Sequence, residues 1–430
     1  MSIEDAIQHH EAGRLAEAER LYRSMLDSEP HHPDALHLLG VLLTQRGEYD
    51  DAVEHIQAAL ETDRDSALFQ SSLAQAYYRG GKAAEAVEAL ERVVAEQPDS
   101  FQSFSDLGAA LQESGELERA VEAYRRAINL NPALDIAHFN LGTALKQLGS
   151  TADAITCVEK AVVMDATQAN YRATLAGYYL EADRLRAALE SCQECLSLAP
   201  RNLTALAFMS IALDRLGERK SSRQLVDFDR LIQKRKLVAP AGYKSVSQFN
   251  EALAKHVRAH PTLRTDPVKN ATRFGKHTDN LLINATGPIP VLVALVEEAV
   301  ADYMRSLPRD PTHPYLAHRP RDFKLMMWSV VMDSQGHQLP HLHPDGWVSG
   351  VYYVELPEKM HAATGRQDGW IEFGRPLPEL TGSLEPEVKV LKPEEGMLVI
   401  FPSYFYHQTI PFESVDQRIC IAFDAIPRSW

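Results

Sequence analysis

Histidine and carboxylate side chains occur at spacings that suit a metal ion. His341, His343 and Asp345 alternate with other residues, and His407 lies in a separate segment downstream. Because residues two apart on a β-strand point to the same face, the first three side chains can converge on one point. A ligand from a distant strand would complete three positions on one face of a metal and leave the others open. The pattern therefore predicts a metal site with positions free for reactants.

The second half of the chain supplies the β-rich scaffold that such a site needs. Short apolar segments separated by turn signals predict strands at 323–332, 347–355, 370–373, 388–391, 397–401 and 418–424. Many short strands at such spacing favour a sandwich or jelly-roll barrel. Capping and proline signals predict helices at 245–259 and 289–306. Residues 237–320 are therefore expected to form a helical support, and residues 321–428 the jelly-roll core.

Three blocks of this half resemble a known family. They are His341-Leu342-His343 followed by Ser349-Gly350-Val351-Tyr352-Tyr353, then Phe401-Pro402-Ser403 with His407, then Arg418 eleven residues after that histidine. Over about residues 245–428 they resemble the double-stranded β-helix of 2-oxoglutarate- and Fe(II)-dependent oxygenases, most of all a bacterial subgroup with the same blocks. Prolyl hydroxylases are more distant relatives. The resemblance implies a hydroxylase that uses Fe(II), 2-oxoglutarate and O2.

The resemblance also implies a binding site for the co-substrate. Arg418 would pair with the distal carboxylate of 2-oxoglutarate, because a guanidinium matches a carboxylate in a two-point contact. Tyr353 would donate a hydrogen bond to the same group, and Ser349 and Gln338 are further candidates. Many relatives carry Ser or Thr two residues after the arginine, whereas this chain has Cys420, which weakens one expected hydrogen bond.

Two sets of metal ligands stay open. His343-Pro344-Asp345 has the His-x-carboxylate spacing of facial-triad oxygenases. The family blocks, however, align best with His341 as the first ligand. We therefore predict His341, His343 and His407 as ligands, with Asp345 as an alternative ligand or as a partner that orients a ring.

The first half of the chain is a repeat array. A Leu and a small residue recur every 34 residues at Leu39-Gly40, Leu73-Ala74, Leu107-Gly108, Leu141-Gly142 and Leu175-Ala176, and an alanine follows twelve positions later in each unit. Small side chains let two helices cross closely, and stacked pairs bury faces that one pair cannot. The pattern resembles the tetratricopeptide repeat over residues 1–236, in about seven units of which the last is a cap. The predicted fold class is thus an all-α tetratricopeptide superhelix followed by a double-stranded β-helix domain at 237–430.

Repeat arrays of this family usually bind peptides in the groove formed by the first helix of each unit. The candidate contacts to a peptide or protein substrate are His37, Gln75, Tyr78, Arg79, Gln112, Phe139 and Thr143. The alternative is a groove that only supports the other domain or a dimer.

Charge and cysteine content exclude several classes of partner. The formal net charge of −15 gives no electrostatic reason to bind nucleic acid or an anionic membrane surface. No apolar run is long enough to span a bilayer.

Four cysteines do not make a disulfide framework, and Cys192 and Cys195 occupy packing positions of a repeat helix. A cytoplasmic protein is expected.

Two other functions remain compatible with these residues. Cupins share the barrel and use HxH with a distal histidine, so a three-histidine iron dioxygenase that does not use 2-oxoglutarate is one alternative. The glutamate that usually follows HxH in cupins is missing, and Arg418 would then lack a purpose. The other alternative is a non-catalytic repeat scaffold with a degenerate barrel, which the complete set of ligand residues disfavours.

Overall fold

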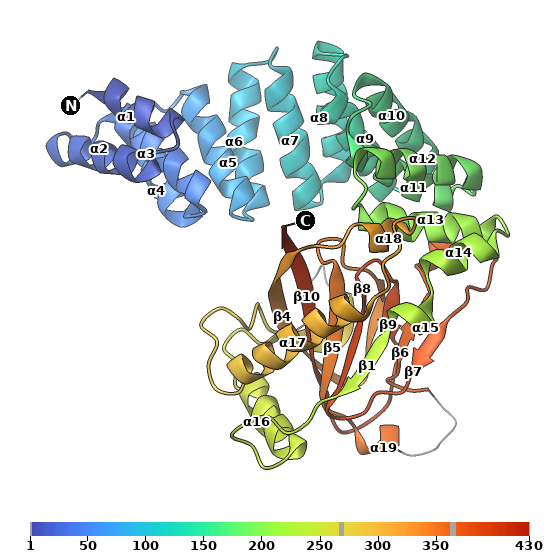
Figure 1. Cartoon of the computed structure of the whole chain (residues 1–430). Coiled ribbons are helices and arrows are strands. Elements are labelled where there is room, and N and C mark those ends of the chain that lie inside the picture. Colours follow the sequence, from blue (N-terminus) through green and yellow to red (C-terminus); the bar gives the residue numbers. More distant parts are fainter. Residues whose placement is uncertain (1, 266–270, 362–366, 430) are drawn as a thin grey trace. The chain divides into compact units, whose positions relative to one another are not determined.

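The computed structural model of the protein describes residues 2–265, 271–361 and 367–429. The chain divides into two compact units, Met1–Thr167 and Gln168–Trp430. Helices make up the first unit, and the second combines helices with a β-sheet (Figure 1). The predicted fold class, a helical repeat array followed by a domain built on a curled antiparallel sheet, is confirmed.

The first unit consists of helices that pack in successive pairs. Their bounds are α1 Ile3–Glu11, α2 Leu15–Ser28, α3 Pro33–Arg46, α4 Tyr49–Thr62, α5 Ala67–Arg79, α6 Ala83–Glu96, α7 Phe101–Ser114, α8 Leu117–Leu130, α9 Asp135–Gln147 and α10 Thr151–Met164. The glycine of each predicted crossing has no room for a side chain. A Cβ at Gly40 would lie 2.4 Å from Ile56 Cγ1, and one at Gly108 would lie 2.6 Å from Tyr124 Cε1. Close packing therefore explains the 34-residue period.

The second unit begins with further helix pairs of the same kind. These are α11 Ala169–Glu181 with α12 Leu185–Leu198, and α13 Leu203–Arg215 with the short α14 Arg219–Leu225. A turn of helix, α15 Phe228–Leu231, then leads into strand β1, Gln233–Lys236. This strand pairs with β8, Met397–Pro402, so residues before position 237 already belong to the sheet. The domain boundary at 236/237 stays a prediction about where the repeat pattern ends.

The sheet of the second unit is antiparallel in every pairing of the described residues. Its other strands are β2 Arg264–Thr265, β3 Thr272–His277, β4 Asp322–His341, β5 Val348–Glu355, β6 Ile371–Phe373, β7 Lys389–Leu391, β9 His407–Thr409 and β10 Arg418–Ser429. They run in the order β1-β8-β5-β10-β4-β9-β6-β7, and β3 pairs with both β2 and β4. Neighbours in space are rarely neighbours in sequence. Residues from distant segments can therefore meet at one site.

Two helices support this sheet near the positions that the sequence predicts. They are α16 Val246–Arg258 and α17 Ile289–Ser306, drawn in yellow and orange in Figure 1. The Tyr352 hydroxyl on β5 donates to Asn250 Oδ1 of α16 at 2.6 Å. Arg235 of β1 pairs with Asp302 of α17 at 2.8 Å. The remaining short helices are α18 Pro314–Ala317, α19 Glu358–His361 and α20 Pro378–Thr381.

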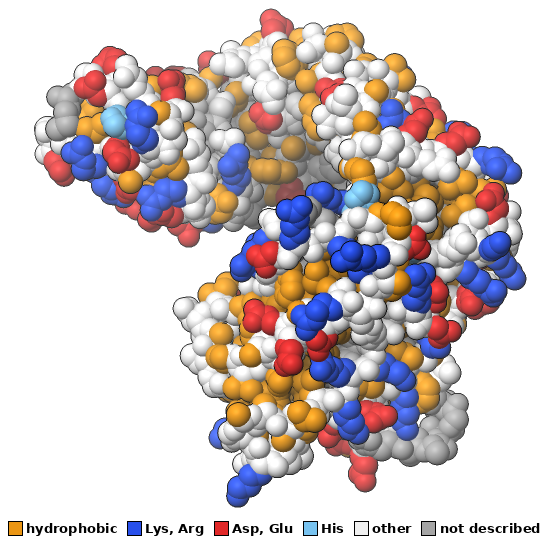
Figure 2. All heavy atoms as spheres, viewed as in Figure 1, with side chains coloured by type: hydrophobic (Ala, Val, Ile, Leu, Met, Phe, Trp, Pro, Cys, Tyr) orange, Lys and Arg blue, Asp and Glu red, His pale blue; other side chains and the backbone are white. Residues whose placement is uncertain are grey.

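The charged side chains of both units are mixed in sign. Figure 2 shows Lys and Arg side chains interspersed with Asp and Glu over the visible face. Within the described ranges, no helix combines the length and the apolar character that crossing a bilayer requires.

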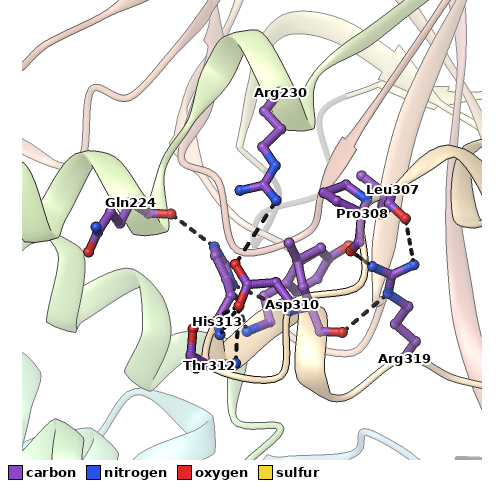
Figure 3. Close-up of polar contacts among 10 residues, drawn as sticks. Gln224, Arg230, Leu307, Pro308, Asp310, Thr312, His313 and Arg319 are labelled. Carbon is purple, nitrogen blue, oxygen red and sulfur yellow. Dashed lines mark hydrogen bonds and ion pairs between the residues drawn. The ribbon is translucent and has the colours of Figure 1, made fainter.

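The loop between α17 and β4 is held by polar contacts that Figure 3 shows. Nε2 of His313 donates to the carbonyl of Gln224 at 2.9 Å, and its Nδ1 accepts from the N–H of Tyr315 at 3.1 Å. Arg319 donates to the carbonyls of Leu307, at 2.9 Å, and Pro308. His313 thus ties the middle of the loop to α14, and Arg319 ties its last part back to the residues that follow α17.

This anchored loop places Tyr315 against Trp347, which lies four residues after His343. The Tyr315 ring stacks on Trp347, with centroids 4.7 Å apart and planes 11° apart. The Tyr315 hydroxyl also donates to the carbonyl of Trp347 at 3.0 Å. Both residues are almost fully buried. The helical support therefore positions the end of the candidate metal-binding loop.

Candidate metal centre and co-substrate pocket

The long strand β4 brings the two histidine segments together. Its first part, Phe323–Met332, pairs with β10, whereas its last part pairs with β9. Between these parts Gln335 adopts a left-handed conformation with φ 66°, and the register shifts again before His341. As a result His341 lies directly opposite His407 on the neighbouring strand.

Three histidines form a compact group at this point. The ring centroids of His341 and His407 are 4.2 Å apart, and each lies 5.2 Å from the ring of His343. One nitrogen from each residue can be chosen so that all three lie within 4.8 Å of one another. Asp345 is not a member of this group, although it lines the same open cavity as His341 and His343. The structure thus brings together the three predicted histidines and leaves the aspartate at the rim.

Each ring uses its Nδ1 nitrogen for an anchoring hydrogen bond. His341 Nδ1 donates to the carbonyl of Leu339 at 2.8 Å, and His407 Nδ1 donates to the carbonyl of Phe405 at 3.0 Å. His343 Nδ1 contacts Asp424 Oδ2 at 3.0 Å. Carbonyl and carboxylate oxygens only accept, so Nδ1 carries the proton in all three rings. The Nε2 lone pairs are left for a ligand, as in histidines that bind metals.

Burial keeps two of these rings neutral. It lowers the pKa of His341 to about 3, and the nearby His343 adds to this effect. The pKa of His407 lies well below its usual value, first because of burial and then because of His341 and His343. A metal binds the neutral imidazole, so neither ring has to lose a proton to bind one at neutral pH. The donor set therefore fits a divalent transition metal.

A buried carboxylate that sequence reasoning missed lies beside His343. Asp424 on β10 is 3% exposed, and its second oxygen accepts from the hydroxyl of Ser349 at 2.6 Å. Ser349 also contacts the hydroxyl of Ser403 at 2.8 Å. Ser349, for which we predict a contact to the co-substrate, makes these two contacts and also lines the pocket that contains Arg418 and Tyr353. The sequence held one indication of this residue. Asp424 is an even number of residues from Arg418 on the same predicted strand, so both side chains point to the same face.

Arg418 and Tyr353 form a buried polar pair in the cavity that the three histidines also line. Arg418 is 1% exposed and Tyr353 is fully buried, and the guanidinium carbon lies 5.2 Å from the centroid of the tyrosine ring. Within the described chain, Arg418 Nε and the Tyr353 hydroxyl have no hydrogen-bond partner. Leaving such groups unpaired is costly, which points to an anionic ligand that completes them. Burial raises the pKa of Tyr353, so its hydroxyl keeps the proton it would donate.

Cys420 and Gln338 line the same cavity. Arg418 Nη1 donates to the Cys420 sulfur at 3.3 Å, so the thiol holds one edge of the guanidinium. Burial raises the pKa of Cys420, which keeps this thiol protonated. Gln338 Oε1 accepts from the hydroxyl of Thr409 at 3.3 Å on the paired strand β9. The walls are completed by the apolar residues Val330, Ile371, Phe401 and Ala422, together with the three histidines.

Aromatic rings hold the histidines from the sides. Trp328 stacks on His343, with centroids 5.6 Å apart, and Phe401 meets the ring of His407 edge-on at 4.7 Å. Outside the histidines the site opens into a cavity of about 340 Å³ lined by Met326, Trp328, Leu342 and Pro344, with Asp345 at its rim. His341 and His343 thus line both this open cavity and the enclosed pocket of Arg418 and Tyr353.

The predicted groove residues of the repeat units differ in how far their side chains are exposed to a partner. Gln75, Tyr78 and Arg79 are exposed, and Tyr78 has 42% of its surface free. His37, in contrast, is buried, and its ring contacts the Ser72 hydroxyl at 2.8 Å, so it is a packing residue rather than a surface contact.

The other predicted groove residues are half-buried. Gln112 donates to Thr143 at 3.2 Å and accepts from Tyr124 at 3.1 Å, so these side chains also brace neighbouring helices. Phe139 is half-buried as well.

Solved structures show partial likenesses. The crystal structure of MamA is 26% identical, with 40% of this chain and 99% of that chain covered and a TM-score of 0.37. PilF from Pseudomonas aeruginosa is 21% identical, with 46% and 90% covered and a TM-score of 0.41. YrrB, described as a TPR protein with an unusual peptide-binding site, is 20% identical, with 43% and 95% covered and a TM-score of 0.37. No curated protein matches the chain.

Family models match both halves of the chain. Tetratricopeptide models cover residues 9–76, 46–111, 111–149 and 136–168. The model described as "Putative 2OG-Fe(II) oxygenase" covers residues 326–424, which include all three histidines, Tyr353, Arg418 and Asp424. The family models thus show tetratricopeptide repeats and a domain of the "Putative 2OG-Fe(II) oxygenase" type in one chain.

Proposed function

We propose that this protein is a 2-oxoglutarate- and Fe(II)-dependent dioxygenase that hydroxylates a peptide or protein substrate. One observation carries the proposal. Three imidazoles, whose Nδ1 atoms are already hydrogen-bonded, line one cavity together with Arg418 and Tyr353, which have polar atoms without a partner. A metal-binding face and an anion-binding pair in one enclosed pocket are what such a reaction requires.

The residues of the site take separate roles in this proposal. His341, His343 and His407 would hold Fe(II) through Nε2. Bound iron, with 2-oxoglutarate and O2, would supply the oxidation that converts a substrate C–H bond to C–OH while 2-oxoglutarate becomes succinate and CO2. Arg418 would pair with the distal carboxylate, and Tyr353 would donate to the same group. The apolar walls would exclude water from the enclosed pocket, which strengthens both contacts.

The metal and co-substrate requirements can be tested together. We expect the anaerobically reconstituted Fe(II) protein to form succinate from 2-oxoglutarate when O2 is admitted, slowly and without any added substrate. The measurement is succinate by mass spectrometry, with the metal-free protein as control. Iron binding without 2-oxoglutarate turnover would favour the cupin-like reaction. Failure to bind iron would leave only the non-catalytic scaffold.

The repeat domain would supply the docking site for the substrate. Tyr78 and Arg79 are exposed at the end of α5, and these two residue types contribute most often to binding energy at interfaces. A partner segment in the groove of the repeats would therefore contact this pair. This part of the proposal rests on the repeat architecture together with the exposure of these side chains.

We expect the double variant Tyr78→Ala/Arg79→Ala to weaken capture of peptides without affecting the oxygenase. Arrayed peptides would be probed with the full-length protein, and loss of a hot spot corresponds to a decrease in affinity on the order of 30-fold or more. Succinate formation without substrate should stay unchanged. The exposed pair Glu85→Gln/Glu88→Gln on α6 is a control for surface charge. Equal peptide binding by the double variant and the wild type would remove this part of the groove from the proposal.

A further inference from the structure

The carboxylate of Asp424 has no role in the reaction described so far. It is buried on β10, yet both of its oxygens are engaged, one by His343 Nδ1 at 3.0 Å and the other by the Ser349 hydroxyl at 2.6 Å. We propose that Asp424 is a positioning residue that orients His343 and brings a negative charge next to the three imidazoles. This inference rests on the proposed metal site.

The anchoring of His343 differs from that of the other two histidines. His341 and His407 each donate to the carbonyl of the residue two positions earlier in their own segments, namely Leu339 and Phe405. His343 reaches instead to a side chain on another strand. A backbone carbonyl is a neutral acceptor, whereas a carboxylate is charged, and a charge-assisted hydrogen bond is stronger than a neutral one. Asp424 would therefore make His343 the strongest donor of the set.

The carboxylate itself is held in place by the hydroxyl of Ser349. Ser349 on β5 lies opposite Asp424 in the register of the sheet, and it also contacts Ser403 at 2.8 Å. Both serines are almost fully buried. The hydroxyl of Ser349 thus orients one oxygen of the carboxylate, and His343 Nδ1 orients the other. Second partners of this kind fix the ring of a metal-bound histidine and raise its basicity.

The loop that carries His343 is fitted closely to this network. The N–H of His343 donates to the carbonyl of Ser403 at 2.9 Å, and the N–H of Trp347 donates to the carbonyl of Ala425 at 2.9 Å. A Cβ at Gly346 would lie 2.9 Å from Ser403 Oγ and 3.2 Å from Asp424 Cγ. Any side chain at this position would press on the network. The glycine permits the approach of the loop to Asp424.

The charge of Asp424 complements the ligand set. Three neutral imidazoles bring no negative charge to a divalent cation, whereas a facial triad with a carboxylate brings one. Asp424 would supply that negative charge from behind the ring of His343, where its carboxylate contacts Nδ1. Asp345, predicted as an alternative ligand or as a partner that orients a ring, is exposed and lines the open cavity, whereas Asp424 makes the contact to His343.

The test uses Co(II) as the probe, with the full-length protein. In Asp424→Asn the amide oxygen can still accept from His343, while the charge is lost. We expect Co(II) affinity to fall about 10- to 100-fold, the range found when such outer partners are changed. The exposed Asp322→Asn in the same sheet is the matched control and should bind like the wild type. Circular dichroism and thermal melting would verify that each variant is folded.

A spectroscopic measurement separates positioning from a general structural effect. Co(II) shifts the exchangeable Nδ1–H signals of its ligands in proton NMR, and three such signals are expected in the wild type. In Asp424→Asn one of them should move and exchange faster with solvent, while the other two stay. Ser349→Ala, which removes one hydrogen bond to the carboxylate, should weaken Co(II) binding by a smaller factor and keeps the test valid if Asp424→Asn does not fold.

The possible outcomes distinguish this inference from the proposed function. Unchanged Co(II) affinity and three unchanged signals in the folded Asp424 variant would overturn the role of Asp424 and leave the dioxygenase proposal standing. Suppose that the wild type binds Co(II), that Asp424→Asn binds it more weakly, and that 2-oxoglutarate is never converted. This result would support the role of Asp424 and overturn the dioxygenase proposal. A wild-type protein that binds no divalent metal would overturn both.

Discussion

Alanine at His341, His343 or His407 is expected to abolish metal binding, whereas Asp345→Ala should only weaken it. The reason is geometric. The three histidines offer nitrogens within 4.8 Å of one another, and Asp345 lies outside that group on the rim of the open cavity. Loss of one ligand of three removes a bond that a solvent-exposed carboxylate at the rim cannot replace. We expect the affinity for Fe(II) to fall by more than the roughly 10- to 100-fold that outer-partner changes cause.

Metal content after anaerobic reconstitution measures this effect. Each alanine variant should be compared with wild type, with and without 2-oxoglutarate, because three neutral imidazoles leave the site more positive than a carboxylate triad would. We expect the anionic co-substrate to tighten iron binding for that reason. Full iron occupancy in His341→Ala together with none in Asp345→Ala would establish the alternative set of His343, Asp345 and His407.

Arg418→Ala is expected to keep the metal and lose the co-substrate. Arg418 is the buried cation of the enclosed pocket, and its Nε has no partner within the described chain. Hydrogen bonds to charged groups contribute about 1.5–3 kcal/mol each. Loss of a two-point contact therefore corresponds to a decrease in 2-oxoglutarate affinity on the order of 10²- to 10⁴-fold.

Titration of 2-oxoglutarate into the anaerobic Fe(II) protein would measure the change. Arg418→Lys is the matched comparison, because it keeps the charge and lacks the planar fork, so its affinity should fall between those of Arg418→Ala and the wild type. Melting curves would show whether the smaller side chains leave the fold intact. Wild-type affinity in Arg418→Ala would mean that the co-substrate is held elsewhere, or that the reaction does not use it.

The repeat array could be predicted closely because its determinants are local. The recurrence of Leu-Gly or Leu-Ala every 34 residues predicts where helices cross, and the structure places Gly40 and Gly108 against the partner helix with no room for a side chain. Each unit contacts mainly its neighbours, so a pattern within one unit carries the information for the whole array. The helices α16 and α17 were predictable for a similar reason, since caps and prolines mark their ends.

Residue type and spacing pointed to the histidines of the site, whereas the resemblance to the oxygenase family supplied the roles expected for Arg418 and Tyr353. The spacing of His341 and His343 predicted that they lie near one point, and the distal block with His407 supplied a third ring. The three do meet, although β4 ends at His341 and His343 lies in the loop that follows. Parity also relates Arg418 to Asp424 on β10, but nothing in the linear pattern relates Asp424 to His343, which lies 81 residues away. Such a contact depends on which strands become neighbours.

The sequence by itself determined the kinds of element, the repeat period and the residue types available for chemistry, because periodicity, capping and side-chain alternation are local properties. Only the tertiary structure decided the pairing of the strands. The shift of register within β4 sets His341 opposite His407, and the position of β10 between β4 and β5 brings Asp424 to His343 and to the hydroxyl of Ser349. A change of register by one residue would turn each of these side chains to the other face of the sheet, so their roles follow from pairings between segments far apart in the chain.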